Sequence, residues 1–223
     1  MKGLFVIGTD TEVGKTIVSA ALMAAAPKHT RYWKPIQTGC ADDSDTKTVQ
    51  DLARLSPQQV FDKGCRFNLP ASPHYAAEQD NARVEISMLT DLANRADAPN
   101  TTWVVEGIGG LMVPLSDTVL LPELVDALDL PMLLVASTRL GTINHTLLTA
   151  QAIAAHRCGG LGIVLVGDRD PSADSGIEAH SPLPVLGRLP HLDSLTPESI
   201  ETAGRALLDN RILHSVLHGD GPS

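Results

Sequence analysis

Short apolar runs alternate with amphipathic stretches along the whole chain. The apolar runs are rich in Val, Ile and Leu, which is typical of buried strands in a parallel sheet. They predict strands at residues 4–7, 30–33, 102–105, 131–136, 161–166 and 184–187. Helical spacing or helix-start signals predict helices at residues 17–24, 42–55, 84–96, 122–128, 145–156 and 197–217. This alternation predicts an α/β fold with a mainly parallel sheet flanked by helices on both faces.

Two segments interrupt this pattern. Residues 56–81 contain Pro57, Pro70 and Pro73, and we expect a loop with irregular helix there. Within that segment, residues 71–74 form either a substrate-facing turn or a structural loop. The connection after residue 170 is polar and has little helical signal. Because the chain contains no internal repeat or low-complexity linker, we predict a single domain over residues 1–223.

The first predicted strand runs into a glycine-bounded loop, Gly8 to Thr16, with the sequence GTDTEVGKT. Such a loop between strand and helix binds triphosphates with backbone N–H groups, a lysine and the helix dipole, and its threonine ligates magnesium. Five residues separate Gly8 from Gly14, whereas the usual pattern has four. The alternative is a strand-to-helix turn with a surface lysine. We favour the phosphate loop.

Two further strand ends carry charged residues. Lys34 follows the strand at 30–33, and Glu106 follows the strand at 102–105, directly before a glycine-rich segment. Since the carboxyl ends of parallel strands face the ligand crevice, we expect both side chains near Lys15. Glu106 holds either magnesium or a lysine, and the acids at 42–45 either cap a helix or serve the metal.

Composition and charge exclude several classes of partner. The net charge of −9 and pI of about 5.2 disfavour nucleic acid and anionic membranes as partners. Three widely spaced cysteines, Cys40, Cys65 and Cys158, suggest reduced thiols and a cytoplasmic protein. No apolar run reaches the ~18 residues that a membrane span needs. The chain also starts directly with a strand, so we expect no signal peptide.

Four motifs together resemble the dethiobiotin synthetase family: residues 8–16, 34–39, 105–110 and 140–145. They occur in that family's order over nearly the whole chain, and the first and last are quite specific. The resemblance implies a homodimeric enzyme of biotin synthesis with a three-layer P-loop NTPase fold. With ATP and Mg2+, such an enzyme joins CO2 to 7,8-diaminononanoate (7,8-diaminopelargonate) and closes a ureido ring, via a carbamate and a carbamic-phosphoric anhydride. ADP and phosphate are released.

The resemblance also implies residue roles. Lys15 would stabilise the transferred phosphate, and Lys34 would face the carbamate. The implied metal ligands are Thr16, Asp45 and Glu106. The implied nucleotide contacts are Glu12, Val13, Gly14, Lys15, Thr16, Ile17, Asp45, Glu106, Gly167, Asp168, Leu189, Pro190 and His191. The implied substrate contacts are Thr11, Thr38, Gly107, Ile108, Gly109, Thr142, Ile143 and Asn144, of which the last three would come from the partner subunit.

One position departs from the family. Many members have an asparagine that reads the adenine where this chain has Gly167, followed by Asp168. Since glycine has no amide side chain, we expect looser base selection, so that CTP or another nucleoside triphosphate could replace ATP. The order in which the two amines react, the extent of the dimer interface and the roles of His74 and His145 stay open.

Three other functions fit the sequence less well than this resemblance. Partition and division-site ATPases carry a signature lysine at the position of Asp10, which this chain lacks. A cobyrinate-type amide synthetase needs a glutamine-hydrolysing domain, for which the chain leaves no room. A non-catalytic nucleotide-binding module would not explain Lys34 together with residues 140–145. We therefore expect a ligase.

Overall fold

The computed structural model describes residues 1–40 and 44–219. Asp42 and Asp43, which we expected at the start of a helix, lie outside the described residues. In the described part of the chain, no helix is long and apolar enough to cross a membrane.

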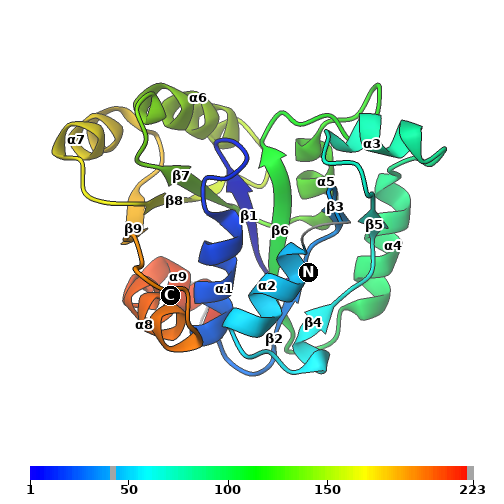
Figure 1. The fold of residues 1–223 in the computed structure, drawn as a ribbon, viewed down its shortest axis with the longest axis horizontal. Helices are drawn as coiled ribbons and strands as arrows, with labels where there is room; N and C mark the ends of the chain where they lie inside the picture. The colour runs from blue at the N-terminus through cyan, green and yellow to red at the C-terminus, as the bar shows by residue number, and fades with distance from the viewer. Residues whose placement is uncertain (41–43, 220–223) are drawn as a thin grey trace.

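A seven-stranded sheet forms the middle layer of the fold (Figure 1). Its strand order is β4-β2-β6-β1-β7-β8-β9, and all neighbouring strands are parallel. The strands are β1 (Gly3–Gly8), β2 (Thr30–Trp33), β4 (Val60–Phe61), β6 (Thr102–Gly110), β7 (Met132–Ser137), β8 (Gly160–Val166) and β9 (Val185–Leu189). The predicted α/β class with a parallel sheet is confirmed, whereas the prediction of a single domain remains a prediction.

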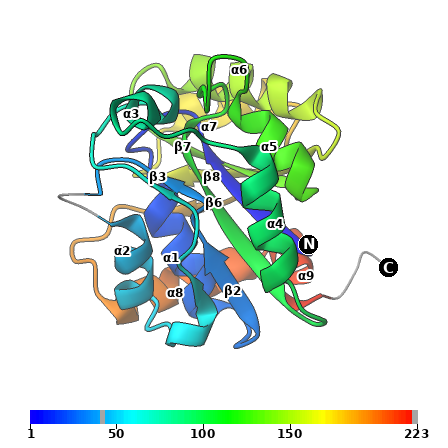
Figure 2. The same ribbon diagram turned by 90° about the vertical axis from the view of Figure 1, so that its right-hand side faces the viewer.

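Helices cover both faces of the sheet (Figure 2). One face packs against α1 (Lys15–Ala25), α2 (Asp45–Leu52), α8 (Pro197–Leu208) and α9 (Arg211–His218). The other face packs against α3 (Pro73–Gln79), α4 (Ile86–Ala96), α5 (Leu121–Leu128), α6 (Thr142–Ala154) and α7 (Pro171–His180). Two apolar cores result, one on each side of the sheet.

Strand β1 shows why its sequence is apolar at every position. Successive side chains of a strand point to opposite faces, so a strand covered on both sides needs apolar residues throughout. Leu4 and Val6 contribute to the core beneath α1 and α8, whereas Phe5 and Ile7 contribute to the opposite core. All four side chains are fully buried. This central, two-sided burial fixes the strand that leads into the phosphate loop.

The interrupted segment contains more regular structure than the pattern suggests. It includes a short 3-10 turn (Pro57–Gln59), strand β4, strand β5 (Cys65–Arg66) and helix α3. Strand β5 pairs in parallel with β3 (Ile36–Gln37) in a separate two-stranded sheet. Such two-residue strands are too short to show a periodic pattern.

Several elements differ from the sequence predictions. The connection after residue 170 is a helix, α7, because Asp170 accepts hydrogen bonds from two backbone N–H groups of its first turn. The last segment forms two helices, α8 and α9, and Asn210 caps the second through the N–H of Ile212. Helix α6 begins at Thr142 after Gly141, three residues before the predicted start at residue 145. Strand β6 continues through Glu106 to Gly110, because it pairs with β1 over this length.

Strand order determines where the ligand crevice lies. The chain passes from β1 to β2 on one side and returns through β6, which lies between them, to β7 on the other side of β1. In open parallel sheets, ligands bind beyond the carboxyl ends of strands where the winding direction reverses. The loops after β1, β2 and β6 therefore meet at one place.

Candidate nucleotide-binding site

The phosphate loop depends on two glycines. Gly14 has φ of +99°, a left-handed conformation that favours glycine, and α1 begins at the next residue. A Cβ atom on Gly8 would lie 2.7 Å from the carbonyl oxygen of Asp10 and 2.9 Å from Nζ of Lys15. These positions therefore need glycine although the spacing between them is longer than usual.

Lys15 lies inside the loop, where its side chain is almost completely buried. Its Nζ donates a hydrogen bond to the carbonyl oxygen of Asp10 at 2.7 Å. Burial, and after it the charge of Lys34, lower the pKa of Lys15 to about 8. A buried ammonium group bound to a neutral carbonyl is electrostatically suited to receive an anion.

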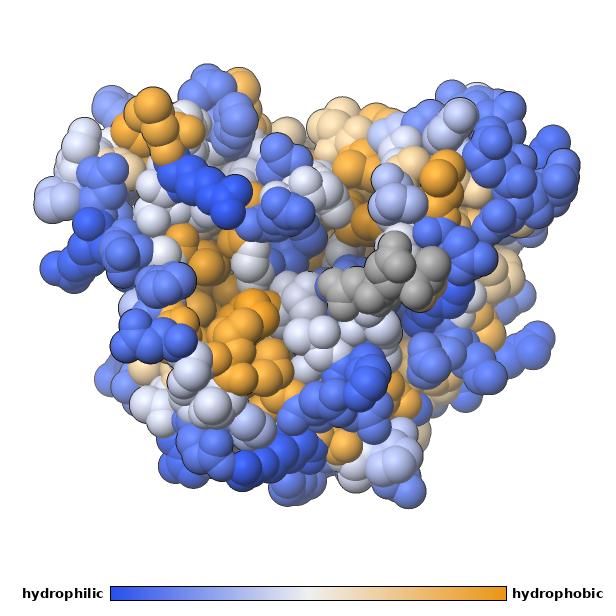
Figure 3. Space-filling view, viewed as in Figure 1, coloured by the Kyte–Doolittle hydropathy of each residue, from blue (hydrophilic) through white to orange (hydrophobic). Residues whose placement is uncertain are grey.

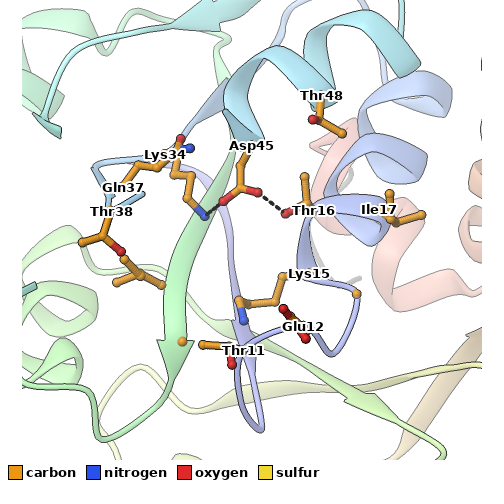
Figure 4. Close-up of a pocket in the computed structure, with 13 residues that line it drawn as sticks. Thr11, Glu12, Lys15, Thr16, Ile17, Lys34, Gln37, Thr38, Asp45 and Thr48 are labelled. Atoms are coloured by element: carbon orange, nitrogen blue, oxygen red, sulfur yellow. Dashed lines mark hydrogen bonds and ion pairs between the residues drawn. The ribbon is translucent and has the colours of Figure 1, made fainter. Parts of the chain in front are cut away.

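A second buried lysine, Lys34, lies across the pocket among carboxylates (Figure 4). Its Nζ lies 2.6 Å from Oδ2 of Asp45 and 2.9 Å from Oε1 of Glu106. It also donates to the carbonyl oxygen of Gly107 at 3.2 Å. Lys34 is 2% exposed and Glu106 is fully buried, whereas the side chain of Asp45 is 29% exposed at the pocket.

The charges in this cluster shift one another's pKa values. Burial alone would lower the pKa of Lys34, but the carboxylates of Glu106 and Asp45 outweigh it and raise that pKa. Burial opposes the ionisation of Asp45, but the charge and hydrogen bond of Lys34 dominate and lower the pKa of the carboxyl group. Both groups are therefore ionised near neutral pH.

Thr16 joins the phosphate loop to this cluster. Its hydroxyl oxygen lies 2.9 Å from Oδ1 of Asp45 and 2.9 Å from Oε1 of Glu106. One hydroxyl and two carboxylates are hard oxygen donors of the kind that Mg2+ prefers, and Mg2+ usually takes few protein ligands beside phosphates and water. The donor set therefore fits magnesium.

These side chains border one pocket of about 430 Å³. Figure 4 shows Lys15 and Thr16 of α1, Asp45 of α2 and Lys34, which follows β2, around it. The lining also includes Thr11, Glu12, Gly14, Ile17, Thr38, Ile108 and Gly109, all of which we expected at the site. The structure thus brings together the expected residues of the first three motifs.

Other expected residues lie outside this lining. Val13 is buried beneath the loop, and Glu106 and Gly107 reach the pocket's edge through their bonds with Lys34. Eight expected residues, all in the described part of the chain, do not line the pocket: Thr142, Ile143, Asn144, Gly167, Asp168, Leu189, Pro190 and His191. Gly167 and Leu189 are nevertheless joined by a backbone hydrogen bond of 2.9 Å, and Val166 packs against Gly14. The end of β8 therefore lies next to the phosphate loop.

Two pocket residues escaped the sequence reasoning. Gln37 lies in β3, between Lys34 and Thr38 in the sequence, and Thr48 lies one helical turn after Asp45 on α2. The spacing of three residues from Asp45 is the signal that could have indicated Thr48, because residues three apart share a helix face. No comparable signal distinguishes Gln37.

The fold and this site define a P-loop nucleoside triphosphate-binding protein. Solved structures with the same fold include a ParA family ATPase from Chlorobium tepidum (TM-score 0.57, 15% identity, 97% of this chain and 98% of that one). The MinC:MinD cell division complex of Aquifex aeolicus is similar as well (TM-score 0.58, 12% identity, 100% and 97% covered). At these identities the likeness shows the fold alone.

The sequence comparisons define the family. A family model described as an AAA domain matches residues 2–199. The ATP-dependent dethiobiotin synthetase BioD of Agrobacterium fabrum is 42% identical over 89% of this chain and 91% of its own length. That of Brucella anthropi is 42% identical over 95% and 97%. The chain belongs to the dethiobiotin synthetase family.

Proposed function

We propose that the protein makes dethiobiotin, carboxylating 7,8-diaminononanoate with CO2 and closing the ureido ring at the expense of ATP. The observation that carries this proposal is the pairing of a phosphate loop with a second buried lysine, Lys34, in one pocket. A non-catalytic module that only binds ATP would not explain this second buried cation at the end of β2. Membership of the dethiobiotin synthetase family supports the same activity.

The phosphate end of the site is assigned to residues of the loop and of α2. The N–H groups at the start of α1 and the ammonium group of Lys15 would hold the β- and γ-phosphates. Thr16, Asp45 and Glu106 would hold Mg2+, which when bound supplies positive charge against the phosphates. Glu12, Val13, Gly14 and Ile17 would complete the nucleotide contacts.

Lys34 is assigned to the reacting carbamate. One amine of the substrate takes up CO2 and becomes a carbamate. An oxygen of the carbamate then accepts the γ-phosphoryl group of ATP, and ADP leaves. The second amine then attacks the carbonyl carbon of this mixed anhydride, so that a C–N bond forms and phosphate leaves. The lysines stabilise the accumulated negative charge, and the pocket holds amine and acyl phosphate together. Thr11, Thr38 and residues 107–109 would line the substrate.

The substrate carboxylate is assigned to a second copy of the chain. Thr142, Ile143 and Asn144 begin α6, whose N-terminal dipole suits a carboxylate. The neighbouring Leu140 is fully exposed, and Met112 and Leu148 are each 60% exposed, which supports a homodimer that covers these apolar side chains. Replacing Leu148 with Asp should produce monomers in sedimentation and raise the KM for the diamine, with little change in nucleotide affinity. A dimer with normal KM would contradict this assignment.

The base of the nucleotide is assigned to the end of β8 and the start of the loop after β9. Figure 3 shows hydrophobic residues gathered on the face that includes α1. The half-buried Ile17 follows Thr16 on that helix. A Cβ atom on Gly167 would lie 2.5 Å from Oγ1 of Thr138, so this position tolerates no asparagine without a shift. Arg188 donates hydrogen bonds to the carbonyl oxygens of Gly167 and Asp168. We therefore propose base reading by backbone groups, with Leu189, Pro190 and His191 beside the base.

This base assignment predicts loose selection among nucleotides. Turnover measured with ATP, CTP and GTP should differ by less than about tenfold, because no side-chain amide is present to read adenine. Strict use of ATP would contradict it.

A cytoplasmic location is also proposed, because the three cysteines are free thiols and a reducing compartment favours free thiols.

The overall function is tested by product formation. Phosphate release from ATP should require both the diamine and bicarbonate, and labelled carbonate should enter an acid-stable product. Omitting either substrate is the control. ATP hydrolysis that is instead stimulated by DNA or by a protein partner would contradict the proposal and favour a nucleotide switch.

A further inference from the structure

Tyr32 lies in the core directly behind the candidate site. It is fully buried on β2, on the side of the sheet that α1 covers. Its hydroxyl group donates a hydrogen bond to Oε2 of Glu106 at 3.0 Å.

The two oxygens of Glu106 are therefore held from opposite sides. Oε2 accepts from Tyr32 in the core, whereas Oε1 lies 2.9 Å from the hydroxyl of Thr16 and 2.9 Å from Nζ of Lys34. Tyr32 pairs in register with Val104, two residues before Glu106, so the strand pairing itself sets the distance between phenol and carboxylate. Such partners behind a metal ligand orient it.

Lys34 has no spare hydrogen-bond donor among these contacts. Its ammonium group has three donors, and three acceptors surround it on Asp45, Glu106 and Gly107. If Lys34 is to contact a carbamate, it must give up at least one of them. The Glu106 carboxylate, which is fully buried, would then lose a donor.

We propose that Tyr32 is a positioning residue that keeps the Glu106 carboxylate oriented toward the metal position while Lys34 turns to the substrate. This inference rests on the proposed function, because that function assigns Lys34 to the substrate. The phenol holds the one oxygen of Glu106 that neither Lys34 nor Thr16 contacts. It therefore supports the carboxylate in both states of the lysine.

The test compares Tyr32→Phe with Tyr75→Phe, which changes the chain's other tyrosine, an exposed one. Mn2+ binding to the protein in the presence of ADP is measured by electron paramagnetic resonance. Tyr32→Phe should weaken Mn2+ binding by about tenfold. It should raise the Mg2+ concentration for half-maximal turnover by the same factor, with kcat at saturating Mg2+ reduced less than about threefold. Tyr75→Phe should leave all three values unchanged.

Mn2+ binding with ADP needs no diamine, so this readout succeeds or fails independently of dethiobiotin formation. A folded Tyr32→Phe variant with normal Mn2+ affinity would overturn the inference, as would a loss of kcat without a change in metal dependence. The double variant Tyr32→Phe/Glu106→Gln provides a second test, in which Lys34 keeps Asp45 as its carboxylate partner. Its Mn2+ affinity should equal that of Glu106→Gln alone, and a further loss would also overturn the inference.

Discussion

The two lysines of the pocket lie in opposite electrostatic surroundings. Lys15, in the phosphate loop, donates to a neutral backbone carbonyl, and among the described residues no carboxylate forms an ion pair with it. Lys34, across the pocket, lies within 3 Å of two carboxylates. Accordingly, the pKa of Lys15 falls to about 8 whereas that of Lys34 rises.

This difference separates two tasks of positive charge in one site. A buried cation without a counterion gains most when a phosphate arrives, which suits Lys15 for binding. Lys34 is already neutralised by two carboxylates, so a new anion stabilises it little. A new anion would stabilise Lys34 more if another cation first took its place beside those carboxylates. Magnesium at Asp45 and Glu106 would be that replacement, so metal binding and the release of Lys34 are coupled in our proposal.

Removing Lys34 should produce the largest change in activity. Lys34→Ala should lower kcat by about 100-fold or more, because a charge that stabilises the transition state is lost. Nucleotide binding, measured by calorimetry, should persist because Lys15 is intact. Lys47→Ala, at an exposed lysine on α2, is the matched control. Near-normal turnover in Lys34→Ala would remove this lysine from the mechanism.

Neutralising Glu106 should weaken the metal site. In Glu106→Gln the shape of the side chain is kept but its charge is lost, so the Mg2+ requirement should rise about 10- to 100-fold. A magnesium titration of turnover measures it. An unchanged titration would mean that Glu106 serves only as an ion-pair partner of Lys34.

The uncompensated state of Lys15 should be visible in stability. Its folded-state pKa of about 8 lies below the ordinary lysine value, so between these values the unfolded chain binds more protons and stability rises with pH. Relative to Lys15→Met, the wild-type protein should gain about 1–3 kcal/mol of unfolding free energy between pH 7.5 and 10. Urea unfolding without nucleotide measures the difference. A constant difference across this range would contradict a lowered pKa.

An exposed ion pair on the same helix provides the smallest effect. Lys47 and Asp51 form a pair on α2, with side chains 73% and 61% exposed. Because solvent screens such pairs, Asp51→Asn should change the unfolding free energy by no more than about 0.5 kcal/mol. A loss of several kcal/mol of unfolding free energy, as expected for a buried charge, would contradict this. Exposure would then not distinguish the Lys47–Asp51 pair from the Lys34–Asp45 pair.

The features that could be predicted correctly are those in which one local pattern carries both structure and chemistry. The strand, glycine loop and helix around Gly14 and Lys15 are encoded by adjacent residues, and so are the family's other motifs. The prediction of little helix after residue 170 was wrong, because the N-cap at Asp170 stabilises α7 although its sequence is only weakly periodic. The predicted start of α6 at residue 145 was also wrong, because the left-handed Gly141 starts that helix three residues earlier.

Tyr32 shows what local patterns cannot reveal. In the sequence it is a β-prone aromatic residue in a buried strand, which core packing explains fully. Its hydrogen bond to Glu106 spans 74 positions of the chain and exists because β2 pairs with β6. Thr48 is similar, since only the approach of α2 to α1 brings it to the pocket.

The sequence by itself determined the alternation of strands and helices, the phosphate loop and the identity of the charged residues at the strand ends. These features depend on neighbours along the chain, through periodicity, glycine conformation and side-chain chemistry. The tertiary structure decided that β6 lies between β1 and β2, so that Glu106 lies between the two lysines' elements. Strand order brings together distant residues, and from it follow the opposite pKa shifts of Lys15 and Lys34.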